Sequence, residues 1–180
     1  MLKKWHQLTS KVLFKNPWWT YKLDTFQIPG GVSGEYHYVY TRGSSMVVPL
    51  TKDGHVVLVN QYRYLCDRES LEFPCGSINE GHTYEQTALL ELQEETGYQA
   101  GAPLQELGQF NPYNGVTSEI CTVYMARDIV PHNGLAKQDE TEEFEVLLLS
   151  PDEIDKKIKH GEIWDGMTLA AWMLAHDQLR

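Results

Sequence analysis

One segment of the chain, 75–98 (CGSINEGHTYEQTALLELQEETGY), places three carboxylates within a single helical turn. Glu91, Glu94 and Glu95 stand at spacings where like charges destabilise a helix by roughly 0.2–0.5 kcal/mol per pair, unless a cation lies between them. The alternative is an acidic helix face in contact with water. Carboxylate oxygens select hard cations, and Mg²⁺ combines few carboxylates with substrate phosphates. The pattern favours a Mg²⁺ site, with Mn²⁺ as a second possibility, and a phosphate ester or anhydride as ligand.

The flanks of these glutamates predict a helix over 83–96. Thr83 is a favourable N-cap residue, and Gly97 is a favourable residue to end the helix. The sequence Asn79-Glu80-Gly81 has turn chemistry. We therefore predict a loop, helix, loop unit that displays the carboxylates.

The same segment resembles the Nudix box, G-x5-E-x7-R-E-U-x-E-E-x-G-U, where U is a bulky apolar residue. The matching residues are Gly76, Glu91, Leu92, Glu94, Glu95, Gly97 and Tyr98. Two positions depart from the pattern, because His82 replaces the first acid and Leu90 replaces the arginine. The resemblance implies that Glu91 and Glu95 bind the metal and that Glu94 shares this role and contributes to catalysis. His82 is either a surface residue or a substitute nitrogen ligand, and imidazole suits Mn²⁺ or Zn²⁺ better than Mg²⁺.

A longer resemblance points to the Nudix enzymes that hydrolyse ADP-ribose and other nucleoside diphosphate sugars. It is carried in chain order by an N-terminal strand extension, QYRY, LEFPCG, Pro112 placed fifteen residues after Gly97, and GEIWDGMTLAAW. The resemblance implies that the backbone carbonyl of Cys75 is a metal ligand and that Arg63 contacts the substrate phosphates. It also matches Glu72 to a carboxylate near the metal loop. The alternative for Arg63 is a surface arginine in a salt bridge.

Other candidates lie outside the box. An acidic loop resembles the mobile loop that brings a glutamate to the attacking water, which implies Glu140 or Glu142 as a catalytic residue. Five acids occur in 139–145, so a solvated acidic loop is the alternative. Trp19 and Tyr113 are candidate substrate contacts, since aromatic rings stack on bases. Such aromatic residues also form cores and dimer interfaces.

Length and charge limit the class of protein. The 180 residues fit one enzyme domain, 43–180, preceded by a strand extension, 1–42, which we expect to support a homodimer. A formal net charge of −10 argues against nucleic acid as a partner. Three widely spaced cysteines suit reduced thiols, and we find no apolar stretch long enough for a membrane span. We therefore expect a cytoplasmic protein.

Hydrophobic patterning predicts an α/β protein with the Nudix fold, a mixed β-sheet between helices. Strands are expected over 18–41 (two or three strands), 45–50, 55–64, 70–74, 104–110, 119–127 and 144–150, and further helices over 150–161 and 167–179. The near-continuous apolar run in 144–150 predicts a strand buried on both faces.

Two functions stay open. The first is metal-dependent hydrolysis of the diphosphate linkage of a nucleoside diphosphate sugar, with ADP-ribose as the leading substrate. The second is a Nudix-fold protein of weakened activity that binds a nucleotide or regulates another protein, which the changes at His82 and Leu90 favour. A nucleoside triphosphate pyrophosphatase is disfavoured by the N-terminal extension and Pro112.

Overall fold

The computed structural model describes residues 2–132 and 145–179, which form two compact units. The first unit combines Met1–Gly43 with Asn111–Ile120, and the second combines Ser44–Phe110 with Cys121–Arg180. The segment Asn111–Ile120 joins the first unit through a backbone hydrogen bond from Val39 N to Val116 O (2.9 Å) and a bridge between Val39 and Thr117. No described helix is long and apolar enough to cross a membrane.

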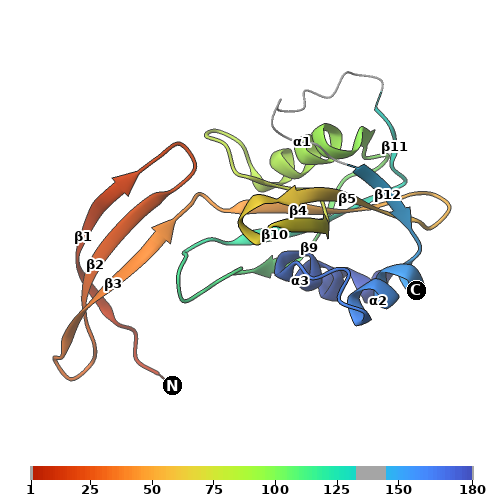
Figure 1. Cartoon of the computed structure of the whole chain (residues 1–180). Helices are drawn as coiled ribbons and strands as arrows, with labels where there is room; N and C mark the ends of the chain where they lie inside the picture. Colours follow the sequence, from red (N-terminus) through yellow and green to blue (C-terminus); the bar gives the residue numbers. More distant parts are fainter. Residues whose placement is uncertain (1, 133–144, 180) are drawn as a thin grey trace. The chain divides into compact units, whose positions relative to one another are not determined.

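The first unit is an antiparallel sheet in the order β1 (His6–Lys15), β2 (Thr20–Gln27) and β3 (Ser33–Tyr40) (Figure 1). The strands expected in 18–41 are confirmed as β2 and β3. Strand β1 was not predicted. All ten of its residues are exposed, so its sequence carries no alternation of buried and exposed positions.

The first unit contributes no side chain to the buried hydrophobic core among the described residues. Its apolar residues instead pair on the surface, where the rings of Trp5 and Phe26 stack at 4.6 Å and those of Phe14 and Trp19 lie 5.6 Å apart. Val12 at 60% and Phe14 at 55% exposure show how much apolar surface β1 presents. This three-stranded sheet therefore lacks a core of its own.

The second unit is built on a mixed sheet in the order β12-β5-β4-β10-β9, with β6 also paired to β5 and β7 to β4. These strands are β4 (Ser44–Leu50), β5 (Val56–Arg63), β6 (Arg68–Glu72), β7 (Cys75–Ser77), β9 (Gln105–Phe110), β10 (Cys121–Arg127) and β12 (Glu145–Leu149). Strands β4 and β10 are parallel, and the other pairs are antiparallel. A small sheet pairs β8 (Tyr98–Gln99) with β11 (Val130–Pro131).

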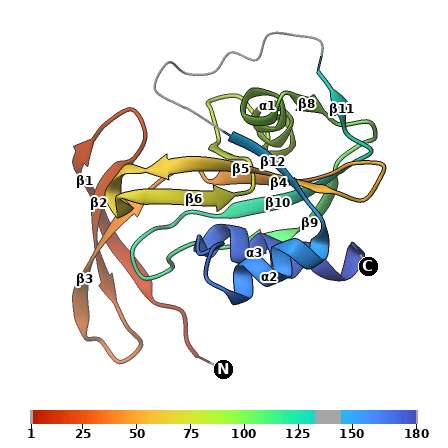
Figure 2. The same cartoon turned by 45° about the vertical axis from the view of Figure 1, so that its right-hand side comes forward.

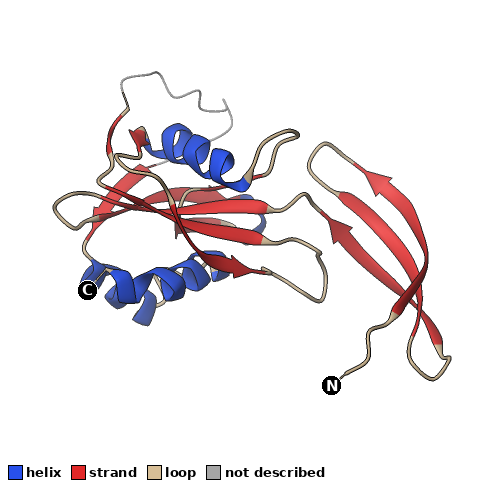
Figure 3. Ribbon diagram, turned by 180° about the vertical axis from the view of Figure 1, so that it is seen from behind, coloured by secondary structure: helices blue, strands red, loops and turns tan. Residues whose placement is uncertain are grey.

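Helices cover both faces of this sheet (Figures 1, 2 and 3). Helix α1 (Tyr84–Thr96) packs on one face through Ala88 and Leu92, against Val47, Val57 and Tyr124. Helices α2 (Pro151–Lys159) and α3 (Gly166–Ala175) cover the other face, where the larger core cluster lies. Short 3₁₀ turns occur at η1 (Tyr64–Cys66) and η2 (His176–Gln178). The predicted α/β class and the helix, sheet, helix layers are confirmed.

The predicted limits of α1 are confirmed by its caps. The Thr83 hydroxyl accepts from Gln86 N at 3.1 Å, and the Gln86 side chain accepts from Thr83 N at 2.9 Å. This reciprocal pair is a capping box that satisfies two backbone donors at the helix start. At the other end Gly97 has φ of 72°, a conformation that glycine adopts without strain.

The prediction that 144–150 is buried on both faces is wrong for its described part. In β12 only Leu149 is buried, while Val146 is 37% and Leu148 is 45% exposed. The reason is topological, because β12 lies at the end of the sheet and, among the described strands, pairs with β5 alone. The apolar composition of the strand does not reveal that it is an edge strand.

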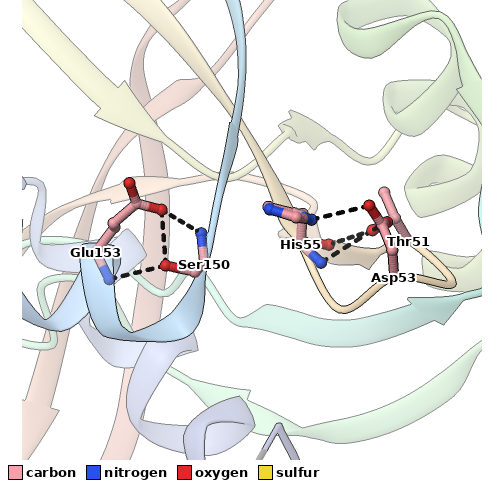
Figure 4. A network of polar contacts seen from close by, with 5 residues as sticks. All are labelled: Thr51, Asp53, His55, Ser150 and Glu153. Carbon is pink, nitrogen blue, oxygen red and sulfur yellow. Dashed lines mark hydrogen bonds and ion pairs between the residues drawn. The ribbon is translucent and has the colours of Figure 1, made fainter.

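Two polar clusters lie beside this edge, one in the turn between β4 and β5 and one at the start of α2 (Figure 4). After β4, the Thr51 hydroxyl accepts from His55 N at 2.9 Å and donates to Asp53, whose other carboxylate oxygen lies 3.1 Å from His55 Nδ1. At the start of α2, Ser150 and Glu153 form a second capping box, which confirms the predicted helix start.

Candidate active site

The predicted metal site begins with a close approach between Gly76 in β7 and Glu91 in α1. The Glu91 carboxylate occupies the space where a Cβ atom on residue 76 would stand, so any side chain there would overlap it. Glycine is therefore required at this position for the carboxylate to lie against the strand. A box glycine and a box glutamate that stand fifteen positions apart in the sequence are in direct contact.

Helix α1 gives its three glutamates different environments. Glu95 is buried, with 8% of its surface exposed, whereas Glu91 and Glu94 are half-buried. Leu92, between them, is fully buried and anchors this turn of the helix to the sheet. The acidic face of α1 is thus turned at least partly toward the protein, which argues against the alternative of a fully solvated acidic face.

Arg63 and Glu72 form a two-point ion pair across β5 and β6. Arg63 Nε donates to Glu72 Oε1 at 2.7 Å, and Arg63 Nη2 donates to Glu72 Oε2. The Glu72 side chain is 4% exposed and that of Arg63 is 47% exposed. The hydrogen bonds that Arg63 donates to Glu72 raise the pKa of Arg63 above its ordinary value, and the charges of Glu72, Asp165 and Glu95 raise it further. The guanidinium therefore interacts electrostatically with Glu95, one of the glutamates of the box.

Cys75 is the first residue of β7, and its thiol interacts electrostatically with two glutamates of α1. It pairs with Met46 in the register of β7 and β4. A hydrogen bond with Cys121 raises the pKa of the Cys75 thiol well above its ordinary value, burial adds to this, and so do the charges of Glu95 and Glu91. Cys75 is therefore a neutral thiol close to both carboxylates, and its metal role stays a prediction for the backbone carbonyl.

The chemistry of these donors fits a divalent cation. Glu91 lies in the space that Gly76 leaves open, Glu95 is buried beside it on the helix, and all their donor atoms are oxygens. Over the described residues, no three histidine, cysteine, aspartate or glutamate side chains are grouped closely enough to hold a metal by themselves. A cation at α1 would have to draw on backbone and substrate oxygens as well, as Mg²⁺ commonly does.

The two departures from the box have different environments. His82 is exposed before the helix, and its backbone N donates to Asn79 O at 3.1 Å. Leu90 is half-buried and belongs to neither hydrophobic core cluster.

The remaining predicted site residues come from other segments of the chain. Glu140 and Glu142 fall outside the described residues. Trp19 and Tyr113 belong to the first unit, where Trp19 packs beside Phe14 and Tyr113 is 66% exposed. Their contacts with substrate stay predictions.

Sequence reasoning missed a set of buried hydroxyls on the sheet beneath α1. Ser45, Ser70 and Thr122 are at most 1% exposed. The sequence did carry a signal for these buried hydroxyls, because each is a polar residue inside a predicted strand. Reasoning from sequence also missed Arg68, whose guanidinium lies 3.6 Å from the centre of the Trp164 ring.

Comparisons with known proteins show the family of the chain. The family model described as NUDIX domain matches residues 40–169. The chain is 31% identical over 150 residues to a methanol dehydrogenase activator of Bacillus methanolicus, covering 83% of this chain and 80% of that protein. It is 29% identical over 158 residues to an ADP-ribose pyrophosphatase of Bacillus subtilis (strain 168), covering 88% and 84%.

Among solved structures, the fold is similar to a crystal structure of an ADP compounds hydrolase, with a TM-score of 0.84 and 21% identity. The match covers 99% of this chain and 96% of that one, and at this identity it supports the fold alone. The family model covers most of the chain, and its span contains the contact between Gly76 and Glu91. The protein therefore belongs to the Nudix hydrolase superfamily.

Proposed function

We propose that the protein hydrolyses the diphosphate linkage of a nucleoside diphosphate sugar and that ADP-ribose is its preferred substrate. AMP and ribose 5-phosphate would be the products. Relatives named ADP-ribose pyrophosphatase in Bacillus subtilis and Mycobacterium tuberculosis support this proposal, the latter with 25% identity over 170 residues. The carrying observation is the fit of the Glu91 carboxylate against Gly76, because it sets an oxygen of a predicted metal ligand beside β7, the strand that begins at Cys75.

Each residue has a specific task in this proposal. Glu91, Glu94, Glu95 and the Cys75 carbonyl would hold Mg²⁺, with Mn²⁺ as a substitute. When bound, the metal would polarise the phosphoryl oxygens, lower the pKa of the attacking water and stabilise the leaving phosphate. Glu140 or Glu142 would orient or deprotonate that water.

Arg63 would bind the substrate diphosphate. The Arg63 side chain is half-exposed, and its guanidinium donates two hydrogen bonds to Glu72. The orientation of the guanidinium is therefore fixed before substrate binds. A guanidinium can use its remaining N–H groups to bind phosphate oxygens. Trp19 and Tyr113 would contribute stacking to the nucleoside.

We further propose that the protein is a cytoplasmic homodimer. The apolar side chains of β1 are exposed, and β1 is an edge of its sheet. An exposed apolar edge strand favours pairing with another chain. A second copy would cover Val12, Leu13 and Phe14.

The second candidate function is a nucleotide-binding or regulatory protein of weakened activity. Two observations favour it: Leu90 stands at the arginine position of the box, and one relative is named a methanol dehydrogenase activator. In this case the fold would bind a nucleotide without efficient turnover.

One experiment separates the two candidates. The purified protein is incubated with ADP-ribose, GDP-mannose, other sugar nucleotides and dinucleoside polyphosphates in Mg²⁺ or Mn²⁺, and phosphate is measured after phosphatase treatment of the products. We expect turnover to be fastest with ADP-ribose. Binding of ADP-ribose by calorimetry without turnover in either metal would favour the second candidate.

A further inference from the structure

Three buried hydroxyls on one face of the central sheet need an explanation. Ser45, Ser70 and Thr122 have exposed fractions of 0%, 1% and 1%, and none has a hydrogen-bond partner within the part of the chain that the structure describes. Buried polar groups are almost always hydrogen-bonded, and an exception often marks a functional role or an ordered water.

Two of these hydroxyls form a row with Gly76 across three adjacent strands. Ser45 in β4 pairs with Gly76 in β7 on one side and with Thr122 in β10 on the other. Side chains two positions apart share a face. Since Val47 and Tyr124 pack beneath α1, Ser45 and Thr122 also face α1.

The row ends at the Glu91 carboxylate, which fills the space beside Gly76. Opposed Cβ atoms in an antiparallel pair lie about 4.5–5.5 Å apart. The Ser45 hydroxyl has no direct hydrogen-bond partner among the described residues, but at this spacing one water can bridge it to Glu91. Thr122 stands one strand further, about 4.8 Å away, so a second water can bridge its hydroxyl to Ser45.

We infer that Ser45 and Thr122 are positioning residues for the Glu91 carboxylate. Ser45 Oγ donates a hydrogen bond to a water that bridges to the Glu91 carboxylate, and a second water links Thr122 Oγ1 to Ser45. These bonds orient the carboxylate toward a divalent cation, a task that the box pattern gives to an arginine and that Leu90 cannot perform. The inference rests on the proposed function, because it assumes that Glu91 binds a metal.

The test measures Mn²⁺ binding without substrate, by the electron paramagnetic resonance signal of free Mn²⁺, in Ser45→Ala and Thr122→Val. We expect Mn²⁺ affinity to fall about 10–100-fold, as is usual when outer partners of metal ligands are lost. The Tm of the metal-free protein should stay equal or rise, because each change removes a buried hydroxyl that has no protein partner. Thr122→Ser retains the hydroxyl and should keep the original affinity.

Ser70→Ala is the matched control. Ser70 is an equally buried hydroxyl, but it pairs with Gln61 on β5 and lies outside the row. Its loss should leave Mn²⁺ affinity unchanged. If Ser45→Ala does not fold, the comparison of Thr122→Val with Thr122→Ser decides the question.

Three outcomes would contradict the inference. Unchanged Mn²⁺ affinity in Ser45→Ala and Thr122→Val overturns the inference and leaves the proposed function intact. An equal loss of Mn²⁺ affinity in Thr122→Ser and Thr122→Val has the same consequence. Absence of Mn²⁺ binding by the unmodified protein overturns the metal site, and this inference with it.

Discussion

The Arg63 guanidinium and the Glu72 carboxylate are joined by two hydrogen bonds, with the carboxylate buried and the guanidinium half-exposed. This difference in exposure suits an arginine that binds a ligand, because the buried carboxylate keeps the guanidinium charged and oriented while the guanidinium itself stays accessible. A carboxylate that binds both Nε and Nη2 fixes the plane of the guanidinium. Within the described part of the chain the guanidinium makes no other hydrogen bond, so its remaining N–H groups can meet an anion.

Replacing Glu72 by Gln should therefore impair substrate binding more than turnover. The amide keeps the shape but loses the charge and one acceptor, so Arg63 is less firmly oriented. We expect KM for ADP-ribose to rise about tenfold or more, with a loss of about 1–3 kcal/mol in the free energy of unfolding. Steady-state kinetics and a thermal melt measure both effects. Glu69→Gln, an exposed acid on the same strand, should change neither, and an unchanged KM in Glu72→Gln would exclude the orienting role.

Glu95→Gln tests the central metal ligand. Glu95 is the most buried box glutamate, and loss of its charge should weaken Mg²⁺ binding and lower kcat by more than about 100-fold. The fold should survive, because the amide has nearly the same volume. Circular dichroism and Mg²⁺-dependent kinetics are the measurements. Glu85→Gln changes an exposed acid in the first turn of α1 and serves as the control. Full activity of Glu95→Gln would remove the proposed site.

Gly76→Ala tests the contact between β7 and α1. The added methyl group would overlap the Glu91 carboxylate and displace it. We expect a loss of activity of about tenfold or more at limiting Mg²⁺, partly recovered at high Mg²⁺, because a misplaced ligand lowers metal affinity. In Gly166→Ala, the control, the methyl group meets open space. The activity of both variants is measured over a range of Mg²⁺ concentrations. Equal behaviour of Gly76→Ala and Gly166→Ala would count against a role for the contact between Gly76 and Glu91.

Restoring the box pattern with His82→Glu and Leu90→Arg should tighten apparent metal affinity and raise activity at limiting Mg²⁺. His82 is exposed, and Leu90 is half-buried outside both core clusters, so both new side chains can reach water. Each variant needs a thermal melt beside its Mg²⁺ titration. A folded double variant with unchanged metal affinity would show that other groups already compensate for the two departures.

The start of α2 should make stability depend on pH. Hydrogen bonds from the Ser150 hydroxyl and backbone lower the pKa of Glu153, and the nearby His55 also contributes. Because the folded-state pKa lies below the unfolded value of about 4.3, the contribution of Glu153 is complete above that pH and is lost as pH falls through the folded pKa.

Glu153→Gln should therefore be less stable than the original protein at neutral pH, and the two should converge as the pH falls below about 4. Ser150→Ala should lower the free energy of unfolding by about 1 kcal/mol through loss of the cap. Thermal melts from pH 3 to 7 measure both effects. Asp152→Asn is the control, because Asp152 is exposed in the same helical turn. A constant difference between Glu153→Gln and the original protein across this range would contradict the assignment.

Local sequence determined the elements whose causes are local. Thr83 and Gly97 set the limits of α1 through hydrogen bonds and backbone angles within a few residues. Ser150 set the start of α2 in the same way. The spacing of Glu91, Glu94 and Glu95 predicted an acidic helix face and, with Gly76, the family. These features follow from the 3.6-residue period of the helix and from capping chemistry, which can be read from one segment.

Only the tertiary structure decided which distant residues meet. The exposure of Val146 and Leu148 follows from the position of β12 at the edge of the sheet, and the row from Gly76 through Ser45 to Thr122 follows from the pairing of three strands. A strand's sequence shows which residues share a face, but its neighbours and register depend on contacts with remote segments. The sequence therefore supplied the candidate ligands, and strand pairing determined which buried groups surround them.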